Sequence, residues 1–118
     1  FSSDSGLWHE LTMVYACECA FTKAVSTSEE LLLSDSTSFY NILIHAELVA
    51  SSGDSSLARM YYCKCLELRP NEPRALWGLL TCCDGELLEA TKMRIQRLYR
   101  ESDESLETKT ALAILKKF

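Results

Sequence analysis

Six cysteines and two histidines are the side chains of this 118-residue chain with the most distinctive chemistry. The cysteines form two Cys-x-Cys pairs, Cys17 with Cys19 and Cys63 with Cys65, and one Cys-Cys pair at 82–83. Thiolates and imidazoles can bind a metal, form disulfides or supply a nucleophile. Neither Cys-x₂-Cys nor His-x₃-His spacing is present, so we expect no metal site and no cofactor.

Helical geometry separates the members of each Cys-x-Cys pair. Each residue of an α-helix advances by about 100°, so residues two apart point about 200° apart. Cys63 and Cys65 therefore cannot hold one metal ion together. We expect Cys65 to be a small buried packing residue and Cys63 to face a neighbouring repeat or solvent. No signal peptide is visible, which favours a reducing compartment and free thiols.

The two histidines do not indicate catalysis. His45 falls at a core position of an amphipathic segment, so we expect a buried and hydrogen-bonded imidazole, whereas His9 falls at an accessible position. No spacing places either histidine beside a thiol, and the chain has no glycine-rich phosphate loop and no serine-centred elbow. The sequence therefore predicts no enzyme activity and no catalytic residue.

Composition limits the classes of partner. With 47% hydrophobic and 25% charged residues, the chain is suited to one globular domain. The formal net charge of −5 argues against nucleic-acid binding, which needs a basic face. No apolar run approaches the roughly 20 residues of a membrane-spanning helix, so we expect no direct membrane insertion. Protein partners remain the best-supported class.

Apolar residues recur at helical spacing along almost the whole chain and predict an all-α fold. Gly53 and Asp54 are typical of a helix end followed by a capped helix start. Pro70 is expected to lie just beyond a helix end, and Pro73 to begin the next helix. The predicted helices cover residues 7–15, 21–33, 38–51, 57–68, 73–83, 86–100 and 106–118.

A shift of about 34 residues aligns the first two predicted helix pairs, which is the period of tetratricopeptide repeats. "WHELTMVY" matches the first half of that repeat and "ARMYYCKCLELRP" the second, with Tyr62 as the aromatic wedge. We therefore predict one tetratricopeptide-like α-solenoid of antiparallel helix pairs over 1–118, with about seven helices. Its repeats are about 5–38 and 39–72, with a degenerate repeat at 73–101 and a capping helix at 105–118.

The first helices of such repeats line a concave groove. The matching positions for a carboxylate clamp hold His9, Met13, Ile44, Arg74 and Gly78, so only the arginine fits and we expect no clamp. A mixed apolar and charged lining suits an extended or helical protein segment. The alternative is that the chain's own last helix or further repeats fill part of the groove. The predicted lining is His9, Met13, Tyr40, Leu43, Glu47, Arg74 and Trp77.

Several segments occur in an order that is specific beyond the repeat itself. "LWHELTMVY" is followed by "KAVSTSEELLLSDS", later by "RALWGLL", and finally by "ETKTALAILKKF". This succession resembles the C-terminal portion of the subunit 2 family of the endoplasmic reticulum membrane protein complex. The short connection around Asp84 and Gly85 and the many cysteines depart from that family.

The resemblance implies a scaffold without chemistry of its own. Members of the family are cytosolic proteins, peripheral on the endoplasmic reticulum membrane, in a complex that inserts transmembrane segments. The implied partners are subunits 3, 5 and 8/9 of that complex, and the family's N-terminal repeats would be absent here. The alternatives are a tetratricopeptide adaptor or co-chaperone of an unrelated assembly, and a helical enzyme domain.

Overall fold

The computed structural model describes residues 5–101 and 106–116. Within those residues the fold consists of seven α-helices and contains no strand, which confirms the predicted all-α class and helix number. Within the segment 105–118, predicted to be a capping helix, the structure has a helix at 106–115, and residues 105, 117 and 118 lie outside the described residues. The helices are α1 (Ser5–Cys17), α2 (Phe21–Ser34), α3 (Phe39–Ser51), α4 (Ser55–Leu68), α5 (Pro73–Cys82), α6 (Gly85–Arg100) and α7 (Leu106–Leu115).

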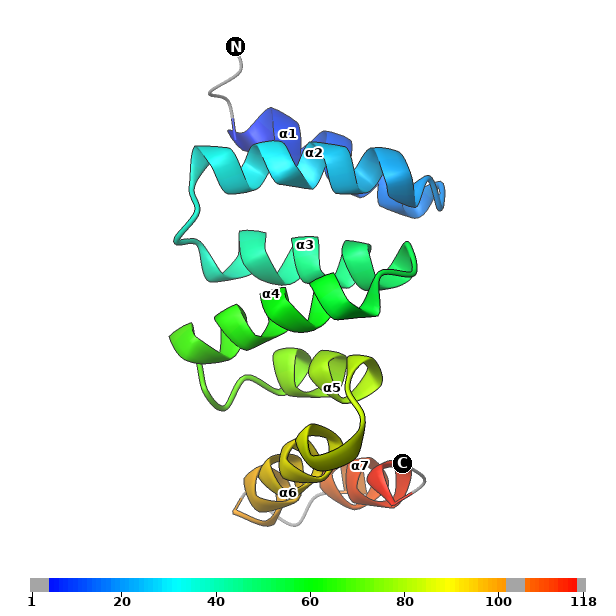
Figure 1. The fold of residues 1–118 in the computed structure, drawn as a ribbon, viewed down its shortest axis with the longest axis vertical. Coiled ribbons are helices and arrows are strands. Elements are labelled where there is room, and N and C mark those ends of the chain that lie inside the picture. Colours follow the sequence, from blue (N-terminus) through cyan, green and yellow to red (C-terminus); the bar gives the residue numbers. More distant parts are fainter. Residues whose placement is uncertain (1–4, 102–105, 117–118) are drawn as a thin grey trace.

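Each helix packs chiefly against the next helix in the sequence, and the described chain forms an elongated stack of 47 × 27 × 26 Å (Figure 1). Helices α1, α3 and α5 begin at residues 5, 39 and 73, so their starts are 34 residues apart, and α2 and α4 show the same spacing. Helix α6 begins earlier than that spacing requires. A further contact joins α3 to α5 and skips α4.

Two of the predicted helix boundaries have the expected local chemistry. The Asp54 carboxylate accepts a hydrogen bond from the Leu57 backbone N–H at 3.1 Å, which caps the start of α4. Gly53 has φ +105°, a left-handed conformation that L side chains rarely adopt, and it closes the turn after α3. Pro73 occupies the first turn of α5, where its missing N–H leaves no helical hydrogen bond unmade.

The prediction that the fifth helix continues through Cys83 is wrong. Cys83 has extended backbone angles (φ −119°, ψ 166°) and so does Asp84 (φ −145°, ψ 176°). Two successive extended residues cannot continue the helical hydrogen bonds, so α5 ends at Cys82. The Asp84 carbonyl then accepts the backbone N–H of Leu88 at 3.3 Å, and α6 begins at Gly85, one residue earlier than predicted.

The main apolar core runs from α3 to α7. Tyr62 of α4 is only 3% exposed, which confirms that this aromatic residue is buried. Its ring lies against Gly78 of α5, where a Cβ atom would be 2.3 Å from two ring carbons. The buried members of this core are Phe39, Ile42, Leu43, Ala46, Val49, Ala58, Tyr62, Cys65, Leu66, Ala75, Leu76, Leu79, Leu80, Cys82, Ile95 and Leu115.

The contact between α1 and α2 has a polar centre. Thr12 and Thr27 are both buried, and their hydroxyl oxygens lie 2.9 Å apart. The Thr27 hydroxyl donates to the Ala24 carbonyl, while the Thr12 hydroxyl also lies 2.7 Å from the Trp8 carbonyl. The first helix pair is therefore joined partly through hydrogen-bonded threonines.

Among the described residues, no helix combines the length and the apolar character that crossing a membrane would require.

Candidate functional site

The predicted groove residues occupy α1, α3 and α5, and all but one of them are at least partly accessible. The exception is Leu43, which is 1% exposed and belongs to the apolar core. Its assignment to an open groove lining is therefore wrong. Seven of the thirteen residues of α3 are buried, because this helix contacts α2, α4 and α5, so only a narrow strip of it faces solvent.

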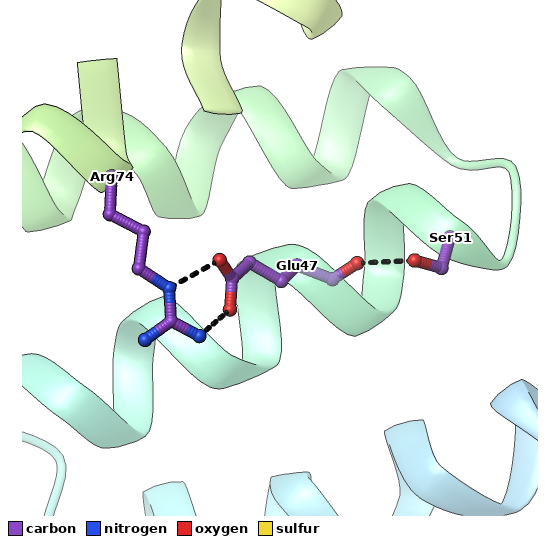
Figure 2. Close-up of polar contacts among 3 residues, drawn as sticks. All are labelled: Glu47, Ser51 and Arg74. Atoms are coloured by element: carbon purple, nitrogen blue, oxygen red, sulfur yellow. Dashed lines mark hydrogen bonds and ion pairs between the residues drawn. The ribbon is translucent and has the colours of Figure 1, made fainter. Parts of the chain in front are cut away.

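The centre of the remaining set is an ion pair between α3 and α5. The Arg74 guanidinium donates two hydrogen bonds to the Glu47 carboxylate, Nε to Oε2 at 2.7 Å and the second to Oε1 at 2.5 Å (Figure 2). The Ser51 hydroxyl donates to the Glu47 backbone carbonyl at 2.9 Å, one turn along α3. This two-point geometry fixes both side chains and connects the two helices at the surface.

The same ion pair makes the surface a poor binding site for a carboxylate. Hydrogen bonding to Glu47 raises the pKa of Arg74 above its ordinary value, so the guanidinium remains charged. Its charge is already compensated by the Glu47 carboxylate, which would also repel an incoming carboxylate. Arg74 is the one residue that matches a carboxylate clamp, and in the structure its side chain instead connects α5 to α3 through Glu47.

A second cluster flanks the ion pair on α3. Tyr40 is 57% exposed, and the Arg69 guanidinium carbon lies 5.1 Å from its ring centroid and 4.4 Å from that of Phe39. Sequence reasoning did not identify Arg69, because its position after the end of α4 gives no sign that it reaches α3. Together, Tyr40 and Arg69 form an accessible aromatic and cationic surface, which is a combination enriched at protein interfaces.

Trp77 is half-buried and faces α6. Its indole N–H donates to the Tyr99 hydroxyl at 3.1 Å, and the two ring centroids lie 6.3 Å apart. Trp77 also packs against the apolar core. This side chain is therefore chiefly part of the contact between α5 and α6.

His9 and Met13 on α1 are exposed. Among the described residues, no hydrogen bond, ion pair or ring contact joins either of them to Tyr40, Glu47 or Arg74. The predicted lining therefore divides into the Glu47–Arg74 pair between α3 and α5, Tyr40 of α3 with its contact to Arg69, and a separate part on α1. We refer to Tyr40, Glu47, Arg69 and Arg74 as the α3–α5 surface.

His45 lies in the interior, as expected from the sequence. It is buried, its Nδ1 lies 2.6 Å from the Ser28 hydroxyl of α2, and its ring meets Tyr61 of α4 edge to face at 4.5 Å. Burial lowers the pKa of His45 from its ordinary value of 6.5, which the negative charge of Glu29 only partly opposes. The imidazole is therefore neutral at pH 7 and connects three helices.

All six cysteines lie in the described part of the chain and are free thiols. Cys65 is buried as predicted, and burial raises its pKa to about 12, so it remains a protonated thiol at neutral pH. Cys63 faces α6 and lines a hollow of about 300 Å³ together with Leu87, Thr91 and Arg94. The described residues include no group of three or more His, Cys, Asp or Glu that could hold a metal ion.

Comparison with known proteins finds relatives that are similar to part of the chain. No protein-family model matches the chain. The ER membrane protein complex subunit 2 of Xenopus tropicalis and subunits 2-A and 2-B of Xenopus laevis are each 33% identical to it over 82 residues. The match covers 67% of this chain but only 28% of the length of each relative. The chain is thus similar to a part of ER membrane protein complex subunit 2.

Proposed function

We propose that this chain is a non-catalytic protein-interaction scaffold related to ER membrane protein complex subunit 2. The observation that carries the proposal is the shared 33% identity over 82 residues with three such subunits. As in the resemblance described above, its role would be to support membrane-protein insertion from the cytosolic face of the endoplasmic reticulum.

The proposed architecture is a tetratricopeptide-like solenoid. The starts of α1, α3 and α5 are spaced by 34 residues, which is the period of that repeat, and successive helices pack in chain order. Tyr62 and Cys65 lie buried at the wedge and small-residue positions of the second repeat. The early start of α6 at Gly85 fits a degenerate third repeat, followed by α7 as a cap.

The proposed docking site is the α3–α5 surface. An exposed tyrosine beside an arginine provides contact area with little conformational entropy to lose, and the ion pair between α3 and α5 keeps the backbone on both sides of it in place. Such a surface suits a helical or extended segment of a protein partner. We propose that the partner is another subunit of the complex, of the subunit 3, 5 or 8/9 type.

Affinity purification of the tagged full chain from cells tests this function. Membranes are extracted with mild detergent, and the bound proteins are identified by mass spectrometry, with a parallel purification in the absence of detergent. We expect membrane subunits of the ER membrane protein complex in the detergent extract. Recovery of chaperones alone would instead favour a co-chaperone, and recovery of no membrane protein would contradict the proposal.

A surface variant tests the docking site separately. We expect Tyr40→Ala with Arg74→Ala to reduce recovery of the partner subunits by about tenfold or more, because both side chains are accessible and central to the surface. Met60→Ala is the control, since Met60 is exposed on α4 and is not a member of the α3–α5 surface. Equal loss with both variants, or no loss with the double variant, would place the docking site elsewhere.

A further inference from the structure

A stripe of exposed side chains runs along α6 on the side opposite its buried face. At about 100° per residue, the stripe occupies about 80° of the helix circumference, while the buried Thr91 and Ile95 lie on the other side. We call this set the α6 stripe. Its members are Glu86, Glu89, Met93, Arg97 and Arg100, all of them exposed.

The positions of the α6 stripe are symmetric about Met93, and the charges on its two sides are opposite. The spacing along the chain is three, four, four and three residues, and it reads the same in both directions. Glu86 and Arg100 each lie about 10 Å from Met93 along the helix axis, and Glu89 and Arg97 each lie about 6 Å from it. One half of the stripe is therefore acidic and the other half basic, at matching distances from an apolar centre.

We propose that the α6 stripe is a self-association interface at which two copies of this chain pair with their α6 helices antiparallel. A two-fold axis through Met93 would place Glu86 opposite Arg100 of the second copy and Glu89 opposite Arg97 of the second copy. The two methionines would meet at the axis. A two-fold interface requires a patch that is complementary to itself, and this stripe meets that requirement in the antiparallel orientation alone. A parallel arrangement would set like charges against each other.

The stripe is available for such pairing. Met93 is 60% exposed and lies at the centre of the charged row. Among the described residues, the structure shows one ion pair within 4 Å, between Arg74 and Glu47. None of the four charged side chains of the α6 stripe takes part in it. The surface on the acidic and basic sides of Met93 is open and shallow, so side chains of a second copy can approach it.

Stabilisation of α6 alone does not account for the stripe. An acidic first turn and a basic last turn do favour a helix through its macrodipole. However, α1 to α5 have no acidic residue in the first turn and no basic residue in the last turn. The macrodipole also requires no exposed methionine midway. Arg94, the remaining arginine of α6, lies off the stripe and donates to the Pro70 carbonyl at 2.6 Å.

The pairing should be weak and sensitive to salt. A single helix pair buries less surface than a stable interface of standard size, and exposed ion pairs are screened by salt. Sedimentation equilibrium of the full chain, from micromolar to about 1 mM at low salt, should show reversible monomer–dimer association. The dissociation constant should rise when salt is added.

Charge exchange identifies the interface. Glu86→Arg with Glu89→Arg makes all four stripe charges positive, and Arg97→Glu with Arg100→Glu makes them all negative. Each double variant alone should raise the dimer dissociation constant by about tenfold or more, because like charges then face each other. An equimolar mixture of the two should dimerise again, since each variant now complements the other.

The control separates the interface from net charge. Glu18→Arg with Glu67→Arg makes the same change in net charge as Glu86→Arg with Glu89→Arg, at two exposed positions outside α6, and should dimerise like the original chain. Circular dichroism checks that every variant keeps its helices, and Glu→Gln and Arg→Gln versions of the stripe replace any variant that does not. The proposal is overturned if the original chain stays monomeric throughout, if both charge variants dimerise normally, or if their mixture fails to pair.

Discussion

The middle of the chain, α3 to α5, and its first helix pair, α1 and α2, are held by different kinds of contact. Leu43, Tyr62 and Leu76 represent a buried apolar cluster to which α3, α4 and α5 all contribute. None of the buried members of that cluster comes from α1 or α2. Between those two helices the buried centre includes the hydroxyl groups of Thr12 and Thr27.

The difference concerns how free energy is distributed along the stack. A fully buried large apolar side chain contributes about 1.5–3 kcal/mol, whereas the net contribution of a hydrogen bond is about 1 kcal/mol. We therefore expect α3 to α5 to be the stable frame of the molecule, on which the α3–α5 surface is displayed. The first pair is attached to that frame partly through the hydrogen bond between Ser28 and His45.

The largest contrast should come from equal truncations in the two regions. We expect Leu43→Ala to lower the free energy of unfolding by about 2–5 kcal/mol, because it leaves a cavity in the frame. Leu33→Ala in α2 should change it by less than about 0.5 kcal/mol, since Leu33 is 80% exposed. Urea unfolding measures both, and similar losses would show that burial of Leu43 in the frame does not stabilise the fold.

A glycine substitution should show a somewhat smaller contrast. Gly78→Ala should cost about 1–3 kcal/mol, because its Cβ would meet the buried Tyr62 ring at 2.3 Å. Gly6→Ala, in an exposed position of α1, should be neutral or stabilise by up to about 1 kcal/mol through helix propensity. Thermal unfolding measures the sign and the size of the stability change for each substitution.

A double-mutant cycle identifies the cause of the Gly78 effect. If the tyrosine ring is responsible, Gly78→Ala should cost less in a Tyr62→Leu background than in the original chain. An unchanged cost would mean that the small residue is required for some other reason, such as the approach of the helix backbones.

The threonine pair tests the polar joint of the first helix pair. Thr12→Val or Thr27→Val alone should cost about 0.5–1.5 kcal/mol, since one buried hydroxyl loses a partner. The double substitution to valine should be nearly neutral or stabilising, because it replaces both polar groups by apolar groups of similar shape. Additive losses in the double variant would contradict the assignment of a polar joint.

The smallest effect we expect is the dependence on pH at the junction of the two regions. Burial lowers the pKa of His45 in the folded state below its ordinary value of 6.5. Between the lowered pKa and 6.5, the folded state therefore binds fewer protons than the unfolded state. The free energy of unfolding should therefore be level above pH 6.5 and fall as the pH decreases below it. Urea unfolding at a series of pH values between about 5 and 8, where carboxylates remain ionised, measures this slope.

His45→Asn provides the control, because it keeps a polar side chain near Ser28 without a titrating group. This variant should show less dependence on pH over the same range. A slope that persists unchanged would assign the effect to other groups.

Helix positions and buried residues could be predicted from the sequence because they depend on local pattern. The Asp54 cap, the Pro73 start and the burial of His45 and Cys65 all follow from residue types at helical spacing. Periodicity shows which residues share a helix face, but it does not show which neighbouring helix covers that face. For this reason periodicity predicts a lining position for Leu43, although the packing of α3 buries this residue.

The contacts within the candidate site could not be predicted from the sequence, because they depend on how the helices are arranged in space. The Arg74–Glu47 pair joins residues on α3 and α5, and Trp77 bonds Tyr99 across α5 and α6, so both depend on how successive helices cross. The end of α5 at Cys82 also had no clear sequence signal, because both cysteines fit the helical pattern. Whether the α3–α5 surface binds a partner remains a prediction, and the purification described above tests it.

Amide hydrogen exchange, resolved by segment, tests most directly whether α3 to α5 form the frame. If α3 to α5 form the frame, amides in the centres of these helices should exchange slowest, through global unfolding. Amides of α1 and α2 should exchange faster, through local opening. Slowest exchange in α1 and α2, or uniform exchange along the whole stack, would contradict this account.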